Sequence, residues 1–331
     1  MDVLVFPLII LASLLLTEFI RRYSVKKDLL DIPNSRSSHS IPTPSGGGLS
    51  IVICFLIVIG FSTSLSTNTI FAFIGSGTLI AIVGFWDDRI SISVRWRLLS
   101  HFIAAILALY WFGSLPEFEF MGLSINLSWF GFVIASFALV WLLNLFNFMD
   151  GIDGIAASEA VYVAFAGAYF SWLNGLESLS YISLILAAST MGFLILNWPP
   201  AKIFMGDVGS SFLGLMLGII VYANILEGSS VWIWLILLGI FLVDSGVTLV
   251  RRVINGEKWY KAHCSHVYQH AARKWGHRKV TLAVIGANLF VLFPIALLVH
   301  HNPEWGGVIT LFIFILLVAI AVKFKAGITV E

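Results

Sequence analysis

Long runs of apolar residues alternate with short polar segments along the whole chain. A run of about 17–25 apolar residues forms an α-helix long enough to cross a bilayer. By this measure the pattern predicts eleven membrane-spanning helices, near residues 3–20, 46–65, 68–86, 98–113, 128–147, 156–173, 178–196, 209–226, 231–250, 281–300 and 305–322. Between the fourth and fifth helices, alternating apolar and polar residues over 116–127 predict a small β-hairpin. The pattern indicates one all-α polytopic membrane domain over residues 1–331.

The first apolar run differs from a cleaved signal peptide. Its positive charges, Arg21, Arg22, Lys26 and Lys27, follow the apolar stretch, whereas those of a signal peptide precede it. We therefore expect this run to remain in the protein as a helix.

Composition excludes most soluble folds. The 331 residues are 59% hydrophobic and 11% charged, whereas soluble chains carry about 25% charged residues. The formal net charge of +1 gives no reason to expect nucleic acid as a partner. Two cysteines are too few for a disulfide framework.

The charged residues are divided between alternate loops. All 19 Lys and Arg fall within residues 21–45, 87–97, 197–208, 251–280 and the C-terminal tail, whereas the other loops contain no Lys or Arg. Because positively charged loops stay in the cytoplasm, we expect the basic segments and the C-terminus to be cytoplasmic. The N-terminus would then lie outside, with the β-hairpin on the same, periplasmic side.

Carboxylates occur at two of the basic segments. Asp87 and Asp88 follow the third predicted helix, and Asp207 comes just before the eighth. Adjacent carboxylates repel each other unless a cation or a proton offsets the charge, and Mg²⁺ binds one or two carboxylates together with phosphate oxygens. A helix N-terminus also favours a bound anion. A solvated turn and a simple helix cap are the plainer interpretations.

The segment NLFNFMDGIDG places four polar residues at intervals of three, namely Asn144, Asn147, Asp150 and Asp153. On a continuous helix this spacing gives one slowly drifting stripe, although the glycines suggest a break. Two amides and two carboxylates at one rim resemble a site for a polar ligand such as a nucleoside. Helix capping with a Gly turn would explain one of the aspartates but not all four residues.

The segment 251–280 contains eight cations and four of the eight histidines. A zinc site formed by His263, Cys264 and His266 is disfavoured, because adjacent positions do not converge easily and a second Cys pair is missing. Cationic loops beside a membrane bind anionic lipid head groups in general; a sharper hypothesis is that these side chains bind phosphate. The acidic residues Glu18, Glu159 and Asp244 lie at membrane depth, and their roles stay open.

Five sequence blocks together resemble one family, the polyprenyl-phosphate N-acetylhexosamine-1-phosphate transferases of glycosyltransferase family 4. This family includes phospho-MurNAc-pentapeptide translocase and the bacterial GlcNAc-1-phosphate transferases. The blocks occur in family order: SHSIPTPSGGG (38–48), GFWDDR (84–89), NLFNFMDGIDG (144–154), NWPPAKIFMGDVGS (197–210) and HCSHVYQ (263–269).

The resemblance implies roles for the matching residues. Asp207 would be the main metal ligand, Asp88 would help to organise the Mg²⁺ site, and Asp87 would deprotonate or orient a lipid phosphate. Other matches concern substrate binding: Asn144, Asn147, Asp150 and Asp153 in the nucleotide-sugar pocket, Asn197 and Phe204 at uracil, Arg97 near the diphosphate, and His263 with His266 in the histidine motif.

The implied reaction moves an N-acetylhexosamine 1-phosphate from a UDP-sugar to undecaprenyl phosphate and releases UMP. It would depend on Mg²⁺, with Mn²⁺ as a substitute, and would take place at the cytoplasmic face of the bacterial inner membrane, in a monomer or a homodimer. The product would start a lipid-linked glycan such as O-antigen or capsule. The sugar itself stays open.

Two departures from the family bear on the substrate. The chain has His-Cys-Ser-His where the cell-wall translocase has consecutive histidines, which disfavours a muramyl-pentapeptide substrate. Ser45 stands where a basic residue is expected, so a phosphate-binding role of the first loop is in doubt. The alternatives are a transporter or flippase for a lipid-linked or anionic solute, and an inactive scaffold, which the intact set of aspartates disfavours.

Overall fold

The computed structural model describes residues 4–33, 38–39, 41–113, 118–120, 123–125, 128–257 and 263–328. Within these ranges the chain is mostly helical and has two small antiparallel sheets. The first half contains α1 (Val5–Lys26), β1 (Leu30–Asp31), β2 (Thr43–Pro44), α2 (Leu49–Gly60), α3 (Thr67–Ile90), α4 (Val94–Phe112), β3 (Phe118–Phe120), β4 (Leu123–Ile125) and α5 (Ser128–Phe148). The second half contains α6 (Ile155–Leu173), α7 (Glu177–Asn197), α8 (Asp207–Leu226), α9 (Val231–Leu237), α10 (Gly239–Ile254), α11 (Val267–Trp275), α12 (His277–Ala287), the π-helical turn η1 (Asn288–Leu292), α13 (Phe293–His301), the 3₁₀ turn η2 (Pro303–Trp305) and α14 (Gly306–Lys323).

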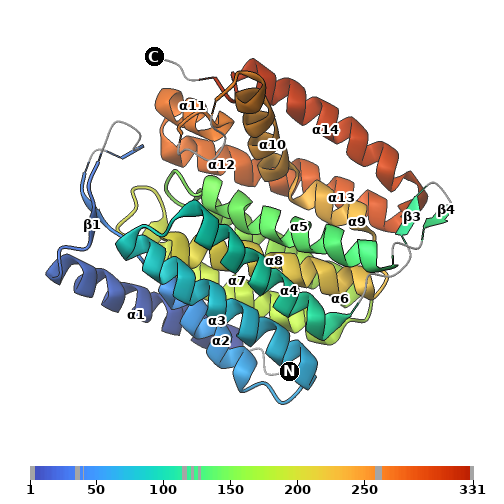
Figure 1. Cartoon of the computed structure of the whole chain (residues 1–331), viewed down its shortest axis with the longest axis horizontal. Helices are drawn as coiled ribbons and strands as arrows, with labels where there is room; N and C mark the ends of the chain where they lie inside the picture. Colours follow the sequence, from blue (N-terminus) through green and yellow to red (C-terminus); the bar gives the residue numbers. More distant parts are fainter. Residues whose placement is uncertain are drawn as a thin grey trace.

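The long helices lie side by side in a bundle, and α8 is at its centre (Figure 1). Helix α8 packs against α3, α5, α6 and α7. In its most apolar stretch 89% of the residues are buried, against 22% for α14 at the edge. An apolar helix that is buried all round belongs to the core. Helix α8 is therefore the central helix, around which the others pack.

Each predicted apolar run coincides with a helix, but the expected eleven spans are not confirmed. Among the described residues, six helical stretches are long and apolar enough to cross a membrane: α3, α5, α7, α8, His277–His301 and Pro303–Lys323. The pair α9 and α10 would make a seventh, although the two helices meet at a bend of 74°. Helices α1, α4 and α6 fall outside this set. The orientation in the membrane stays a prediction.

The predicted span 46–65 is wrong in length, because α2 has only 12 residues. Gly47 and Gly48, which were expected in its first turn, precede the helix. Their backbone N–H groups donate to the carbonyls of Phe204 and Met205, each at 2.9 Å. An added Cβ at Gly48 would lie 2.4 Å from the Cα of Gly209. These glycines therefore bring the first loop against the segment before α8.

Three other local features differ from the expectation. The predicted span 231–250 is the bent pair α9 and α10, the span 281–300 is interrupted by η1, and the basic segment 251–280 contains the helix α11. The small sheet of β1 and β2 was not expected. The hairpin is confirmed by the antiparallel pairing of β3 with β4, in which Phe120 lies opposite Leu123; its turn residues lie outside the described ranges.

Two of the acidic residues at membrane depth have polar partners. Glu18 accepts hydrogen bonds from Arg21 and Arg22, each at 2.7 Å. Glu159 is buried, and its Oε2 accepts a hydrogen bond of 2.6 Å from Nδ2 of Asn288 in η1. Each of the two carboxyl groups thus has a close polar partner, as a buried polar group requires.

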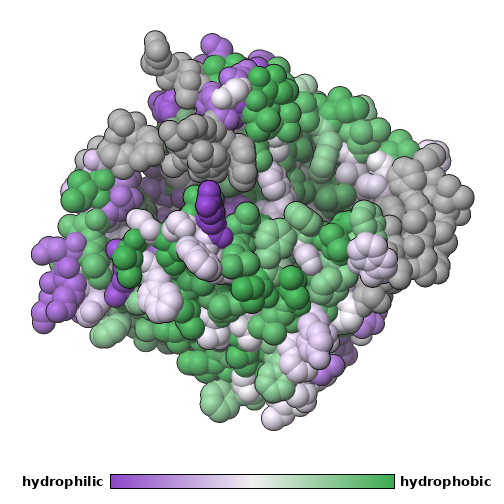
Figure 2. Space-filling model, in the orientation of Figure 1, coloured by the Kyte–Doolittle hydropathy of each residue, from purple (hydrophilic) through white to green (hydrophobic). Residues whose placement is uncertain are grey.

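On the face shown in Figure 2, the bundle is apolar over its middle and more polar at one end. Hydrophobic residues cover most of the face shown in Figure 2, whereas hydrophilic residues gather where α1 finishes and α11 lies. This distribution is typical of a protein embedded in lipid. The polar end is also where the candidate site is found.

Helices α3 and α8 approach closely at Gly84, where an added Cβ would lie 2.7 Å from the Cα of Val208 and 2.8 Å from the carbonyl oxygen of Asp207. We expect Gly84→Ala to push α8 away from α3 and to lower the stability by about 1–3 kcal/mol, the usual cost of overpacking. The measurement is thermal unfolding of the purified protein in detergent. Gly246→Ala is the control, because an added Cβ at that helical glycine meets no heavy atom within 4 Å. Equal melting temperatures for the two variants would contradict the close approach.

Candidate active site

A polar cleft of about 430 Å³ opens at the hydrophilic end of the bundle. Five stretches far apart in the sequence form its walls: the first loop, the end of α3, the α5–α6 connection, the segment before α8 and the segment before α11. Eight of the predicted site residues line it, namely Asp88, Asn147, Asp150, Asp153, Asn197, Phe204, Asp207 and His263.

Asp88 caps the N-terminus of α8. Its Oδ1 accepts a hydrogen bond of 2.7 Å from the backbone N–H of Asp207, and its Oδ2 accepts one of 3.2 Å from the N–H of Val208. A carboxylate at this position satisfies free N–H groups and interacts favourably with the helix dipole. Asp88 therefore already occupies part of the anion-binding position that the sequence suggested for a substrate.

Asp207 lies between an amide and a guanidinium. Nδ2 of Asn147 donates to its Oδ1 at 2.8 Å, and Nη1 of Arg97 lies 3.5 Å from its Oδ2. The same Nη1 lies 2.9 Å from Oδ2 of Asp87, whose Oδ1 accepts from the backbone N–H of Ile92 at 2.6 Å. Both oxygens of Asp87 are thus engaged, and Asp87 with Arg97 stands behind Asp207, outside the set of residues that line the cleft.

Two of the predicted asparagines brace the structure. Asn144 also lies outside the cleft lining, and its Nδ2 donates to the carbonyl of Val140 at 2.7 Å. Asn197 is 2% exposed; its Oδ1 accepts from the N–H of Gly154 at 3.0 Å, and its Nδ2 donates to the carbonyl of Ile203 at 2.9 Å. Because both ends of its amide are engaged, Asn197 joins two walls of the cleft.

The carboxylates at the cleft differ sharply in environment. Burial raises the pKa of Asp153, but hydrogen bonds from His277 and from the backbone N–H of Ala201 outweigh it and leave the pKa below its usual range. Burial raises the pKa of Asp150 well above its usual range, and the negative charges of Asp207 and Asp88 add to this shift. Carboxylates that raise each other's pKa favour a bound cation or proton.

The donor atoms suit a hard divalent cation. Asp207 and Asp150 are oxygen donors at the cleft, and Mg²⁺ prefers such donors, completed by water and substrate phosphates. Within the described ranges, three or more His, Cys, Asp or Glu side chains nowhere form a metal-binding group. Of the two predicted ligands, Asp88 accepts hydrogen bonds from two backbone N–H groups of α8, whereas Asp207 accepts one from the amide of Asn147 and has Arg97 at 3.5 Å.

The two predicted histidines form two layers. His263 lines the cleft, and its Nδ1 lies 3.1 Å from Oγ of Ser265. Burial, together with the nearby His266 and Arg252, lowers the pKa of His263 to about 3, so its ring is neutral at pH 7. His266 lies behind it, with the two rings stacked at a centroid distance of 4.9 Å. His263 is therefore placed to donate a neutral N–H rather than to act as a cation.

Two cleft residues were missed by the sequence analysis. His277 lies 3.1 Å from Oδ1 of Asp153 through Nδ1, and its Nε2 lies 3.0 Å from the carbonyl of Ser38. The ring of His39 meets Phe204 edge-on, at a centroid distance of 4.8 Å. His39 is part of the block SHSIPTPSGGG, which was the available signal. His277 had no signal beyond its place in a histidine-rich segment.

The middle of the chain matches a known family model. The family model described as glycosyl transferase family 4 matches residues 70–225, which include Asp87, Asp88 and Asp207. These matches support glycosyl transferase family 4 as the family of the chain. This confirms the resemblance that the five sequence blocks suggested.

Relatives in family 4 cover most of the chain. A probable undecaprenyl-phosphate N-acetylglucosaminyl 1-phosphate transferase of Bacillus subtilis is 28% identical over 96% of this chain and 90% of its own length. The undecaprenyl-phosphate alpha-N-acetylglucosaminyl 1-phosphate transferase of Escherichia coli O157:H7 is 26% identical over 95% of this chain and 89% of its own. A phospho-N-acetylmuramoyl-pentapeptide-transferase of Pelagibacter ubique is 31% identical over 62% and 66%.

The low pKa of Asp153 leads to a prediction about stability and pH. A carboxyl group whose pKa is lower in the folded than in the unfolded protein stabilises the fold above the unfolded value, near 4, and loses this effect as the pH falls through the folded value. We expect Asp153→Asn to cost about 1–3 kcal/mol at neutral pH, with the difference from wild type shrinking below about pH 4. Melting temperatures measured across this range test it. The control is Asp28→Asn, which changes an exposed carboxylate; a pH-independent loss for Asp153→Asn would contradict the assignment.

Proposed function

We propose that the protein transfers an N-acetylhexosamine 1-phosphate from a UDP-sugar to undecaprenyl phosphate and releases UMP. The observation that carries this proposal is the pairing of two cavities: a polar cleft rich in carboxylates lies next to an apolar groove, with one short segment between them. Such a pair suits a reaction between a water-soluble donor and a lipid acceptor. The names of the two relatives that transfer N-acetylglucosamine 1-phosphate support the same reaction class.

The polar cleft suits the donor. Its volume of about 430 Å³ lies within the range of small-molecule sites. Phe204 offers an aromatic surface for uracil, and Asn147, Asp150 and Asp153 offer polar groups for the sugar and ribose hydroxyls. We propose these roles from the types of side chain and from their place in the cleft.

The apolar groove suits the acceptor's tail. It has a volume of about 450 Å³ and lies between α10, α11, α12 and α14, with Val243, Val284, Leu317 and Phe324 among its lining residues. A polyprenyl chain gains about 0.8 kcal/mol for each CH₂ removed from water. Lys279 also lines the groove and is a cation close to where a lipid phosphate would pass.

The reaction depends mainly on how the two substrates are positioned relative to each other. In the net reaction an oxygen of the lipid phosphate forms a bond to the β-phosphorus of the UDP-sugar, and the bond from that phosphorus to UMP breaks. Phosphoryl transfer of this kind depends on alignment and on charge stabilisation rather than on covalent work by the protein. Arg97 supplies positive charge next to Asp207, and His263 supplies an N–H donor. Mg²⁺, held by Asp207 with Asp150 or Asp88 nearby, would add positive charge at the diphosphate.

The place of the reaction follows from the charge pattern. Four of the five stretches that form the cleft belong to the basic segments of the chain, and basic segments face the cytoplasm. We therefore propose an inner-membrane enzyme with a cytoplasmic active site that starts a lipid-linked glycan such as O-antigen or capsule. Mn²⁺ is proposed as a substitute for Mg²⁺, and a homodimer is compatible with the proposal.

Purified protein tests this function directly. We expect UMP release only when undecaprenyl phosphate, one member of a panel of UDP-N-acetyl-sugars and Mg²⁺ are all present, and removal of the metal with EDTA should abolish it. The sugar that supports turnover identifies the donor. Movement of a lipid-linked solute across vesicles without UMP release would instead favour the transporter or flippase.

Asp207→Asn should reduce UMP release by at least about 100-fold, because it removes one of the carboxylates of the proposed metal site. The response of the remaining activity to Mg²⁺ concentration should also be weakened. Asp31→Asn is the matched control, since Asp31 lines the same cleft but its side chain is 49% exposed. Unchanged Mg²⁺-dependent turnover in Asp207→Asn would refute the role of Asp207.

A further inference from the structure

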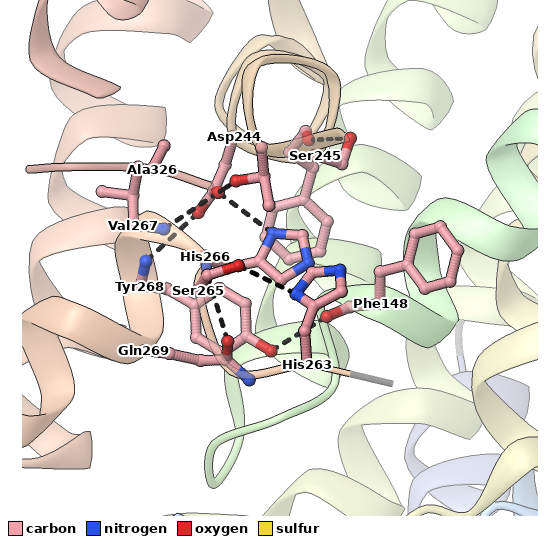
Figure 3. A network of polar contacts seen from close by, with 12 residues as sticks. Phe148, Asp244, Ser245, His263, Ser265, His266, Val267, Tyr268, Gln269 and Ala326 are labelled. Atoms are coloured by element: carbon pink, nitrogen blue, oxygen red, sulfur yellow. Dashed lines mark hydrogen bonds and ion pairs between the residues drawn. The ribbon is translucent and has the colours of Figure 1, made fainter. Parts of the chain in front are cut away.

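A buried carboxylate in the bent helix α10 holds together the segment that precedes α11. Asp244 is 5% exposed. Its Oδ1 lies 3.1 Å from Nδ1 of His266 and accepts from the backbone N–H of Val267 at 3.0 Å, and its Oδ2 accepts from the N–H of Tyr268 at 3.1 Å. Thr248 donates to the same Oδ1 at 3.2 Å. Figure 3 shows His266, Val267 and Tyr268 converging on Asp244.

The network determines the proton position on one histidine. Because Oδ1 of Asp244 is an acceptor, Nδ1 of His266 must carry a proton, which leaves Nε2 on the other side of the ring. The backbone N–H of His266 donates to Oε1 of Gln269 at 3.1 Å. A histidine whose second nitrogen is held by a carboxylate has a defined tautomer and orientation. His266 is fixed in this way.

The orientation of the His266 ring affects the polar cleft through His263. This ring stacks on His263, with 27° between the ring planes, and His263 lines the cleft (Figure 3). The hydroxyl of Tyr268 donates to the carbonyl of Phe148 at 2.9 Å, at the end of α5. An added Cβ at Gly151 would lie 2.2 Å from this hydroxyl. The side chain of Tyr268 therefore joins the start of α11 to the start of the α5–α6 connection, whereas Asp244 contacts Tyr268 through its backbone N–H.

The same segment is the wall between the two cavities. Asp244, Val267 and Tyr268 line the apolar groove. His263, Cys264 and Gln269 line the polar cleft. An acceptor with its tail in the groove and its phosphate in the cleft must cross at this wall. The donor, in contrast, is placed by residues of the cleft that Asp244 does not contact.

We propose that Asp244 is a positioning residue for the lipid acceptor, which acts through His266 to hold His263 where the acceptor's phosphate enters the cleft. This inference rests on the proposed function. It differs from a structural role, in which Asp244 would only cap α11 and support the fold. The two roles predict different kinetics.

Steady-state kinetics with both substrates separate them. In Asp244→Asn we expect the KM for undecaprenyl phosphate to rise about tenfold, the usual scale for loss of a carboxylate behind a functional histidine, while the KM for the UDP-sugar changes less than twofold. Thr248→Val is the matched control, because it removes one donor to Asp244 but leaves the bond to His266. It should keep wild-type kinetics. An equal rise of both KM values in Asp244→Asn would overturn the proposal.

A double-mutant cycle tests whether Asp244 acts through His266. His266→Gln and the double variant Asp244→Asn/His266→Gln should have the same KM for undecaprenyl phosphate, because residues that act as one unit are not additive. Additive effects would overturn the proposal. If Asp244→Asn does not fold, His266→Gln alone decides, since an unchanged acceptor KM there is also incompatible with the proposal. Failure of the wild-type protein to release UMP would refute the proposed function instead.

Discussion

The contact on which the site depends is the cap that Asp88 provides for α8. One carboxylate at the end of α3 accepts from two backbone N–H groups at the start of α8. The absence of a side chain at Gly84 lets the two helices meet there. Since α8 is the central helix and begins with Asp207, this contact sets the position of Asp207 relative to α3. The other cleft walls then pack around a fixed pair of carboxylates.

The sequence predicted which residues gather at the cleft better than it predicted what each one contacts. Asp87 and Asp88 are adjacent, but successive residues of a helix point about 100° apart, so one pairs with Arg97 and the other caps α8. Asn144 and Asn147 lie three residues apart on α5, but of the two only Asn147 lines the cleft. Apolar runs located the helices, whereas the short α2 and the 74° bend in α9–α10 depend on tertiary packing. Local pattern contains no information about such packing, as the glycine contacts of the first loop show.

The cleft has more negative charge than the neighbouring cations neutralise. Arg97 contacts Asp87 and Asp207, yet the pKa of Asp150 stays well above its usual range because of burial and the nearby carboxylates. Such an arrangement costs folding free energy when nothing is bound. It is useful where a cation has to be held between protein carboxylates and a diphosphate, which agrees with the proposed reaction and not with a passive scaffold.

A donor that dissolves in water and an acceptor that dissolves in lipid pose a geometric problem. Their reacting atoms must meet although their other parts need opposite surroundings. Here the polar cleft and the apolar groove share the segment 263–269 as a wall. Asp244 fixes that wall to α10, the half of a broken helix that departs by 74° from α9. A straight helix would continue along the bundle axis, whereas the bend carries α10 toward α11 and α14. The break in the helix thus allows the apolar groove to open directly beside the polar cleft, as the proposed reaction between a lipid and a nucleotide sugar requires.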